Sequence, residues 1–129
     1  MAEVDSNLRT FLLAQASVTA IFSTRIYVDK ISVKAVYPYA IIKTVTESPG
    51  YAHDGALPDT SLMQIDVRST AKSTASSGAA AIKAVLSGYS GAISGITAGS
   101  VFITNSIPRY DPDERVFIRT IDALISQNG

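Results

Sequence analysis

An α+β fold is the architecture that this sequence predicts, with a mixed or antiparallel sheet of about four strands and two main helices packed on one face. Two observations predict this class. Apolar residues recur at helical spacing in residues 4–16 and again in residues 70–86, whereas the segments between and after them alternate or are rich in β-branched side chains. A domain of this length buries roughly two-thirds of its unfolded surface, so we expect a single domain over residues 1–129.

The N-terminal segment is expected to form an amphipathic helix of about three turns, followed by a second short helical turn. Asp5 or Ser6 can cap the first helix and Ser17 the second, because their side-chain oxygens accept bonds from free amide groups. The apolar positions are Val4, Leu8, Phe11 and Leu12 in the first helix and Val18, Ile21 and Phe22 in the second. Residues 25–27 are expected to lie in a loop or an irregular edge segment.

Two strands are predicted in the middle of the chain. Residues 37–46 are rich in β-branched and aromatic side chains, and Pro38 stands at their start, where a missing amide donor is tolerated. Residues 61–69 alternate between apolar and polar side chains, which predicts a half-buried strand. Residues 48–59 between them are dense in turn residues and are expected to form a long excursion.

An alanine-rich helix, a glycine-rich loop and a short strand are predicted next. Thr70 can cap the helix, and Ala75, Ala79, Ile82 and Leu86 form its apolar stripe. Gly78 lies inside this helix at a cost of about 1 kcal/mol relative to alanine. Residues 87–100 contain a glycine every three to four residues and are expected to be a mobile or partner-ordered loop, before a strand at residues 101–107.

The closing segment, residues 107–126, predicts a turn and a long strand with apolar residues on both faces. Phe117, Ile121, Ala123 and Ile125 point one way, and Val116, Ile118 and Leu124 point the other. A chain of this size rarely has enough layers to cover both faces. The pattern therefore indicates either a central strand or a contact between subunits.

Composition excludes several classes of function. Eleven basic and eleven acidic residues give a net charge of zero, so no global field attracts nucleic acid or an anionic membrane. There is no cysteine to form a disulfide or bind a metal, and neither a signal peptide nor a membrane span is expected. Only 17% of the residues are charged and the mean hydropathy is +0.22. This apolar balance reflects either an interface or the many glycines and alanines.

Candidate catalytic groups are few and isolated. His53 is the only histidine, and with Asp54 and Gly55 it is better explained by a turn than by a metal site or a catalytic triad, which need further converging groups. The glycine-rich loop lacks the GK[ST] sequence of a phosphate-binding loop. Asp66 and Asp122 could form a carboxylate pair, but a polar row or an ion pair with Arg68 or Arg119 explains them better.

Two pairs of a basic and an aromatic residue resemble parts of a surface that binds single-stranded nucleic acid. They are Arg25 with Tyr27 and Arg109 with Tyr110. Because the pairs are separate and the chain is neutral, salt bridges and packing explain them better, although a ring could line its channel with copies of one such side chain. We expect no enzymatic activity, no cofactor and no metal.

Read in order, a set of short sequences extends over nearly the whole chain: RIY at residues 25–27, Pro38–Tyr39, Tyr51 with Asp54–Gly55, QIDV before an alanine-rich helix, and Tyr110 before an acidic turn and a final strand. In this order the chain resembles the tail-completion or tail-terminator proteins of long-tailed, siphovirus-like bacteriophages and prophages. It departs from their pattern at residues 67–69 and 121–125, where an aromatic residue expected in each strand is absent.

The resemblance implies a structural virion protein at the head-tail junction, made in the host cytoplasm. It implies a ring, commonly of six subunits, that caps the tail tube, ends tail polymerisation and meets the head connector. Implied partners are other copies of the chain, the tail tube protein and a connector or neck protein, with no membrane and no sequence-specific nucleic acid. The expected interface residues are Phe117, Ile118, Arg119, Asp122, Tyr51 and Asp54, and residues 48–59 and 87–100 are expected to order against partners.

Two alternatives remain open at this point. One is a head-completion or neck connector protein, which the sequence does not separate from a terminator. The other is a non-viral α+β domain that binds a small molecule, or acts on one, in a pocket under the glycine-rich loop.

Overall fold

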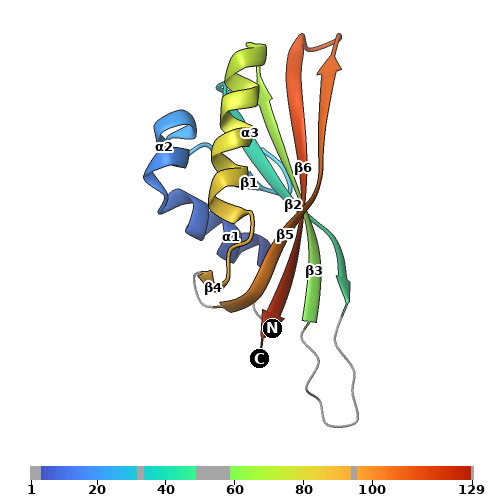
Figure 1. Ribbon diagram of the computed structural model, residues 1–129. Helices are drawn as coiled ribbons and strands as arrows, with labels where there is room; N and C mark the ends of the chain where they lie inside the picture. The colour runs from blue at the N-terminus through green and yellow to red at the C-terminus, as the bar shows by residue number, and fades with distance from the viewer. Residues whose placement is uncertain (1–3, 32–33, 49–58, 94–95, 129) are drawn as a thin grey trace.

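A six-stranded sheet organises the chain, as a computed structural model of residues 4–31, 34–48, 59–93 and 96–128 shows (Figure 1). The strands are β1 (Ile26–Val28), β2 (Tyr39–Ser48), β3 (Asp59–Ser69), β4 (Gly91–Ile93), β5 (Ile96–Asp111) and β6 (Val116–Asn128). Their order is β1-β2-β3-β6-β5-β4, and every neighbouring pair is antiparallel except β1 with β2. The α+β class is confirmed, with more strands than the four expected.

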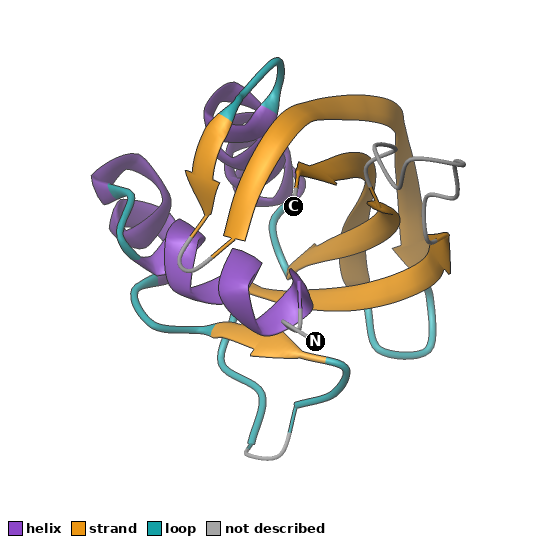
Figure 2. Ribbon diagram, turned by 90° about the horizontal axis from the view of Figure 1, so that it is seen from below, coloured by secondary structure: helices purple, strands orange, loops and turns teal. Residues whose placement is uncertain are grey.

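Three helices cover one face of this sheet: α1 (Val4–Leu13), α2 (Ala16–Phe22) and α3 (Lys72–Leu86). Figure 1 and Figure 2 both show them together on the same side of the strongly twisted sheet. The fully buried core between helices and sheet includes Leu8, Leu12, Phe22, Ile82 and Leu86 from the helices and Ile42, Ile65, Ile121 and Ile125 from the strands. Within the described segments, no helix has the length and hydropathy of a membrane span.

Two segments contain short strands, one where a loop or an irregular edge segment was expected and one where a loop was expected. Residues 26–28 form β1, the sheet's parallel edge strand, with Ile26 fully buried opposite Ala40. The expectation of a loop over residues 87–100 is wrong, because β4 and the start of β5 form a small hairpin there. Gly91 adopts a φ of 129°, which favours glycine, and the fully buried Ile93 anchors the hairpin in the core.

The closing strand β6 is a central strand, paired with β3 on one side and β5 on the other. Its residues Ile121, Ala123 and Ile125 belong to the core under the helices. Val116 and Ile118 are buried on the opposite face. The apolar pattern on both faces is therefore explained by this central position.

The start of α3 and the glycine inside it both depend on tertiary contacts. The N-cap is Ala71 and not Thr70, which corrects the expected capping. The Ala71 amide instead donates to Ser69 Oγ at 3.2 Å, which ties the helix start to the end of β3. Gly78 is buried against α2, where a Cβ atom would lie 2.6 Å from Phe22 Cζ. Close packing of α2 on α3 thus requires glycine at this position.

Candidate assembly surface

The sheet face opposite the helices, here called the open face, carries most of the polar side chains of the strands. Strand alternation and register assign its members, because successive side chains point to opposite faces. They are Tyr39, Ile41 and Lys43 of β2; Leu62, Gln64, Asp66 and Arg68 of β3; Ile118, Thr120, Asp122 and Leu124 of β6; and Phe102, Asn105, Ile107 and Arg109 of β5.

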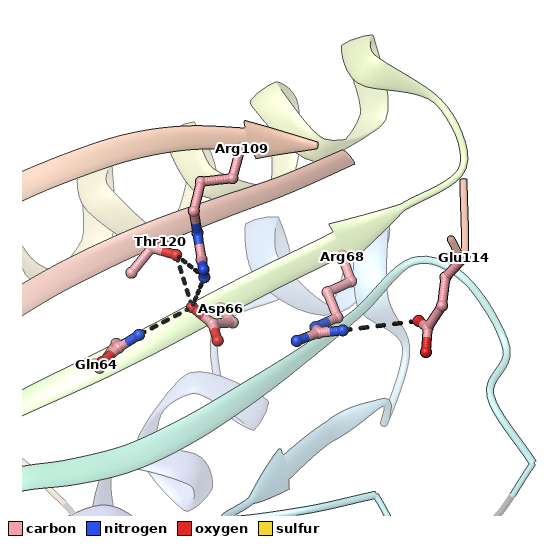
Figure 3. A network of polar contacts seen from close by, with 6 residues as sticks. All are labelled: Gln64, Asp66, Arg68, Arg109, Glu114 and Thr120. Atoms are coloured by element: carbon pink, nitrogen blue, oxygen red, sulfur yellow. Dashed lines mark hydrogen bonds and ion pairs between the residues drawn. The ribbon is translucent and has the colours of Figure 1, made fainter. Parts of the chain in front are cut away.

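A buried carboxylate organises the centre of this face (Figure 3). Asp66 is only 3% exposed, and its Oδ1 accepts hydrogen bonds from Thr120 Oγ1 at 2.8 Å and Gln64 Nε2 at 3.3 Å. Arg109 Nη2 lies 3.5 Å from the same oxygen and donates to Thr120 Oγ1 at 2.8 Å. A buried charge needs such partners because desolvation penalises it. The network therefore ties β3, β6 and β5 together.

These contacts correct one expectation and assign a structural role. Asp66 is buried and pairs with Arg109, whereas the sequence favoured a polar row or a pair with Arg68 or Arg119. Arg119 instead extends toward the helices, where its Nη2 donates to Ser76 Oγ at 3.1 Å. The register places Ile107 of β5 level with Asp66, so Arg109 reaches Asp66 from two residues further along that strand. This neighbourhood depends on strand pairings that the sequence does not show.

A second charged group lies at the end of β3 that is next to α3. Arg68 Nη1 is 3.8 Å from Glu114 Oε2, which belongs to the turn between β5 and β6 (Figure 3). Burial raises the pKa of the Tyr39 phenol, and the charge of the neighbouring Arg68 partly opposes that rise. Arg68 Nε is buried without a hydrogen-bond partner among the described residues.

Aromatic pairs lie on both faces of the sheet, with Tyr39 on the open face and Phe117 on the helix side, like Arg119. The ring of Tyr39 lies 5.4 Å from that of Tyr37 and 6.1 Å from that of Tyr27, between centroids. Across the sheet, the rings of Tyr110 and Phe117 are 4.8 Å apart and tilted. Such geometries are favourable for aromatic pairs. They stiffen the β1–β2 edge and the β5–β6 hairpin.

Exposed apolar side chains gather on two strands that sequence reasoning did not single out. Among the described residues, the large hydrophobic side chains that are exposed are Val36 at 54%, Val45 at 48%, Phe102 at 57%, Ile107 at 40% and Tyr110 at 49%. Four of these five lie on β2 and β5. The sequence could not identify these side chains as exposed, because their exposure depends on β2 and β5 lying near the two ends of the sheet.

The predicted interface residues of β6 lie in different surroundings. Phe117 is half-buried against Tyr110, and Ile118 is buried on the open face. Arg119 lies on the helix side, and Asp122 is half-buried on the open face opposite Gln64. Both backbone edges of β6 are taken, so another protein could contact this strand only through side chains. Tyr51, His53 and Asp54 lie outside the described residues.

Within the described segments, no group of three or more potential ligands could hold a metal ion. The arginines of the two basic–aromatic pairs make contacts within the chain. Arg25 Nε donates to Pro38 O at 2.9 Å, and Arg109 belongs to the Asp66 network. On β2 and β5 the exposed apolar side chains Val45 and Phe102 lie among polar ones such as Lys43 and Asn105.

Comparison with known proteins agrees with this description. Residues 6–125 match the model of a family described as tail completion protein gp17. The chain belongs to this family. It is therefore a structural protein of a bacteriophage tail and a component of the virion, and the resemblance to tail-completion proteins stated from the sequence is confirmed.

A solved structure shows the same fold. The chain is similar to one in the "Virion of native gene transfer agent (GTA) particle", with a TM-score of 0.76 and 15% identity. The similarity covers 98% of this chain and 95% of that one. At this low identity, the likeness bears on the fold alone. No curated protein was found to match the sequence.

Proposed function

We propose that this tail completion protein assembles into a ring that caps the finished tail tube, ends tail polymerisation and forms part of the head-tail joining interface. Six subunits is the number that the family resemblance implies. Its partners are further copies of the chain, the tail tube protein and a head connector or neck protein, and its place is the head-tail junction.

The family match over residues 6–125 is the observation that carries this proposal. The surface supports it, because exposed apolar side chains on an otherwise neutral chain favour association through contact. Their position on two separate strands of the sheet suits a ring, in which one patch of each subunit meets a different patch of its neighbour.

We keep the expected interface residues in the proposal, but only some of them are placed to contact another protein directly. Phe117 and Asp122 are half-buried and can contribute side-chain contacts from the β5–β6 hairpin and the open face. Ile118 and Arg119 are engaged inside the subunit, so their effect on assembly would be indirect. Tyr51 and Asp54 remain candidates for contact with tail or connector proteins.

Light scattering over a concentration series tests the ring, first on the chain alone and then with tail tube protein from the same phage. The expected result is a species of about six subunits, alone or only with tube protein. A capping assay follows, in which the chain is added to growing tubes and tube length is measured by electron microscopy.

The outcomes separate the proposed function from its alternatives. Shorter tubes with the chain at one end support a terminator. A ring that leaves tube growth unchanged but binds the head connector favours a neck protein. A chain that stays monomeric and ignores tube protein at every concentration refutes the proposal, and a ligand-dependent rise in melting temperature would then favour a small-molecule-binding domain.

A further inference from the structure

Two long strands of the sheet have stretches with no strand partner on their outer side. β1 covers only residues 40–42 of β2, so the outer edge of residues 43–48 has no paired strand within the described chain. β4 covers only residues 96–98 of β5, so residues 100–111 have β6 on one side and, among the segments that the structure describes, no strand on the other. On that side Gly88 N, from the segment after α3, donates a backbone hydrogen bond to Val101 O at 3.0 Å.

These two unpaired stretches lie at the same level of the sheet. Thr46 of β2 and Phe102 of β5 are connected by the register through directly paired residues of β3 and β6. Lys43 and Asn105 are level with each other by the same route. Each strand also has a bulge at about this level, between Thr44 and Thr46 in β2 and between Ile103 and Asn105 in β5.

The unpaired stretch of β5 lacks the usual protection of an edge strand. Natural edges are guarded by charged residues, prolines and covering segments. Residues 100–107 contain no charged residue and no proline, and Phe102 and Ile107 within them are exposed. Pro108, which has no amide to donate, is level with Ala40, where β1 already covers β2. The proline of β5 therefore lies at a level where the outer edge of β2 is already paired with β1, and not at the level of the unpaired stretch of β2.

The two stretches are also complementary in chemistry. Val45 and Phe102 are 48% and 57% exposed and would bury apolar surface against each other's strand. The β2 stretch carries one charge of each sign, Lys43 and Glu47, and residues 100–107 of β5 carry none of their own. The nearby cation of α3, Lys83, donates to Ser106 Oγ at 3.3 Å.

We propose that the free edge of β5 pairs with the free edge of β2 in a second copy of this chain, which joins the sheets of neighbouring subunits head to tail. This inference rests on the proposed ring and names its subunit contact. Three antiparallel steps separate β2 from β5, so the two strands run in opposite directions. Copies related by rotation about an axis along the strands would place them antiparallel and at equal levels.

Disulfide crosslinking tests this contact, because the wild-type chain contains no cysteine and every disulfide therefore reports an introduced pair. The test variants are Thr46→Cys with Phe102→Cys, and Val45→Cys with Phe102→Cys, oxidised under the conditions in which wild type assembles. A bond inside one subunit is excluded, since three strand spacings separate β2 from β5 by roughly 14 Å and a disulfide needs Cα atoms within about 7 Å.

The expected result is a ladder of crosslinked chains on a non-reducing gel, rising to the size of the ring and collapsing to one chain when reduced. Each single-cysteine variant can form dimers at most. The matched control pairs Phe102→Cys with Ala84→Cys, an exposed position on α3, and is expected to give no ladder.

Charge variants give an independent measurement. Phe102→Arg and Thr46→Arg are expected to keep the circular dichroism of wild type and to lose assembly, because each places a charge at the joined edge. Ala84→Arg is expected to assemble like wild type.

The results distinguish the contact from the ring. If wild type assembles while neither cysteine pair gives a ladder and both arginine variants still assemble, the edge pairing is wrong and the ring stands. If wild type stays monomeric with and without tube protein, both the contact and the proposed function are refuted.

Discussion

Replacing Gly78 by alanine is expected to destabilise the protein, although the same change in an isolated helix would stabilise it. The new Cβ would lie 2.6 Å from Phe22 Cζ and 3.1 Å from Val67 Cγ1. Carbon atoms are comfortable at about 3.5–4.0 Å, so the Phe22 ring would have to move by roughly 1 Å. Phe22 is fully buried, which leaves the ring little room to do so.

Two opposing terms set the size of the effect. Alanine in place of glycine contributes about 1 kcal/mol through helix propensity. Overpacking a filled core costs about 1–3 kcal/mol. The net change is a loss of up to about 2 kcal/mol in the free energy of unfolding, or up to about 8 °C in melting temperature for a chain of this length.

A double-mutant cycle with Phe22→Leu isolates the contact. Urea unfolding of wild type, Gly78→Ala, Phe22→Leu and the double variant gives four free energies. Because leucine removes the ring atoms that meet the new methyl group, alanine should be better tolerated in the Phe22→Leu background. We expect a coupling energy of about 1 kcal/mol or more.

An exposed position of the same helix supplies the control. Ala80→Gly meets no packing constraint and is expected to cost about 1 kcal/mol through propensity alone. A Gly78→Ala variant that melts about 4 °C above wild type, with no coupling to Phe22, would refute the packing explanation.

Three further predictions concern the open face and the hairpin. Thr120→Val removes a buried donor to Asp66 and should cost about 1–3 kcal/mol in urea unfolding, whereas Thr104→Val at an exposed hydroxyl should cost less than about 0.5 kcal/mol. Burial raises the pKa of Tyr39, so the contribution of this phenol to stability is present below pH 10.0 and falls as the pH rises above that value. Tyr39→Phe should therefore reduce the loss of melting temperature at alkaline pH. An unchanged loss in the variant would contradict this prediction. Phe117→Ala should cost at least about 1 kcal/mol in the free energy of unfolding by removing the tilted ring pair with Tyr110. If assembly, measured by light scattering, weakens more than this loss of stability explains, the result would support an interface role for Phe117.

Local patterns determined much of the fold. Helical spacing located α1, α2 and α3, and alternation located β3, because a helix or strand shows its buried face in the residues of one segment. The ordered short sequences also pointed to the family. None of these inferences needed knowledge of which segments meet in space.

Pairing between distant segments determined the rest. The sequence could not show that Asp66 would find its cation in Arg109, since that contact depends on the order of three strands. β1 and β4 escaped prediction because three-residue strands carry no period of their own and are defined by their partners.

The sequence by itself determined the α+β class, the positions of the main helices and strands, and the family, because local periodicity and the order of short sequences indicate these features. Only the tertiary structure decided that the closing strand is central, that β2 and β5 have stretches without a second strand partner among the described residues, and that Gly78 is a packing requirement. The physical reason is that strand edges, burial and steric clashes depend on contacts between segments that are distant in the sequence. Glycine is required at residue 78 only because Phe22 packs against it.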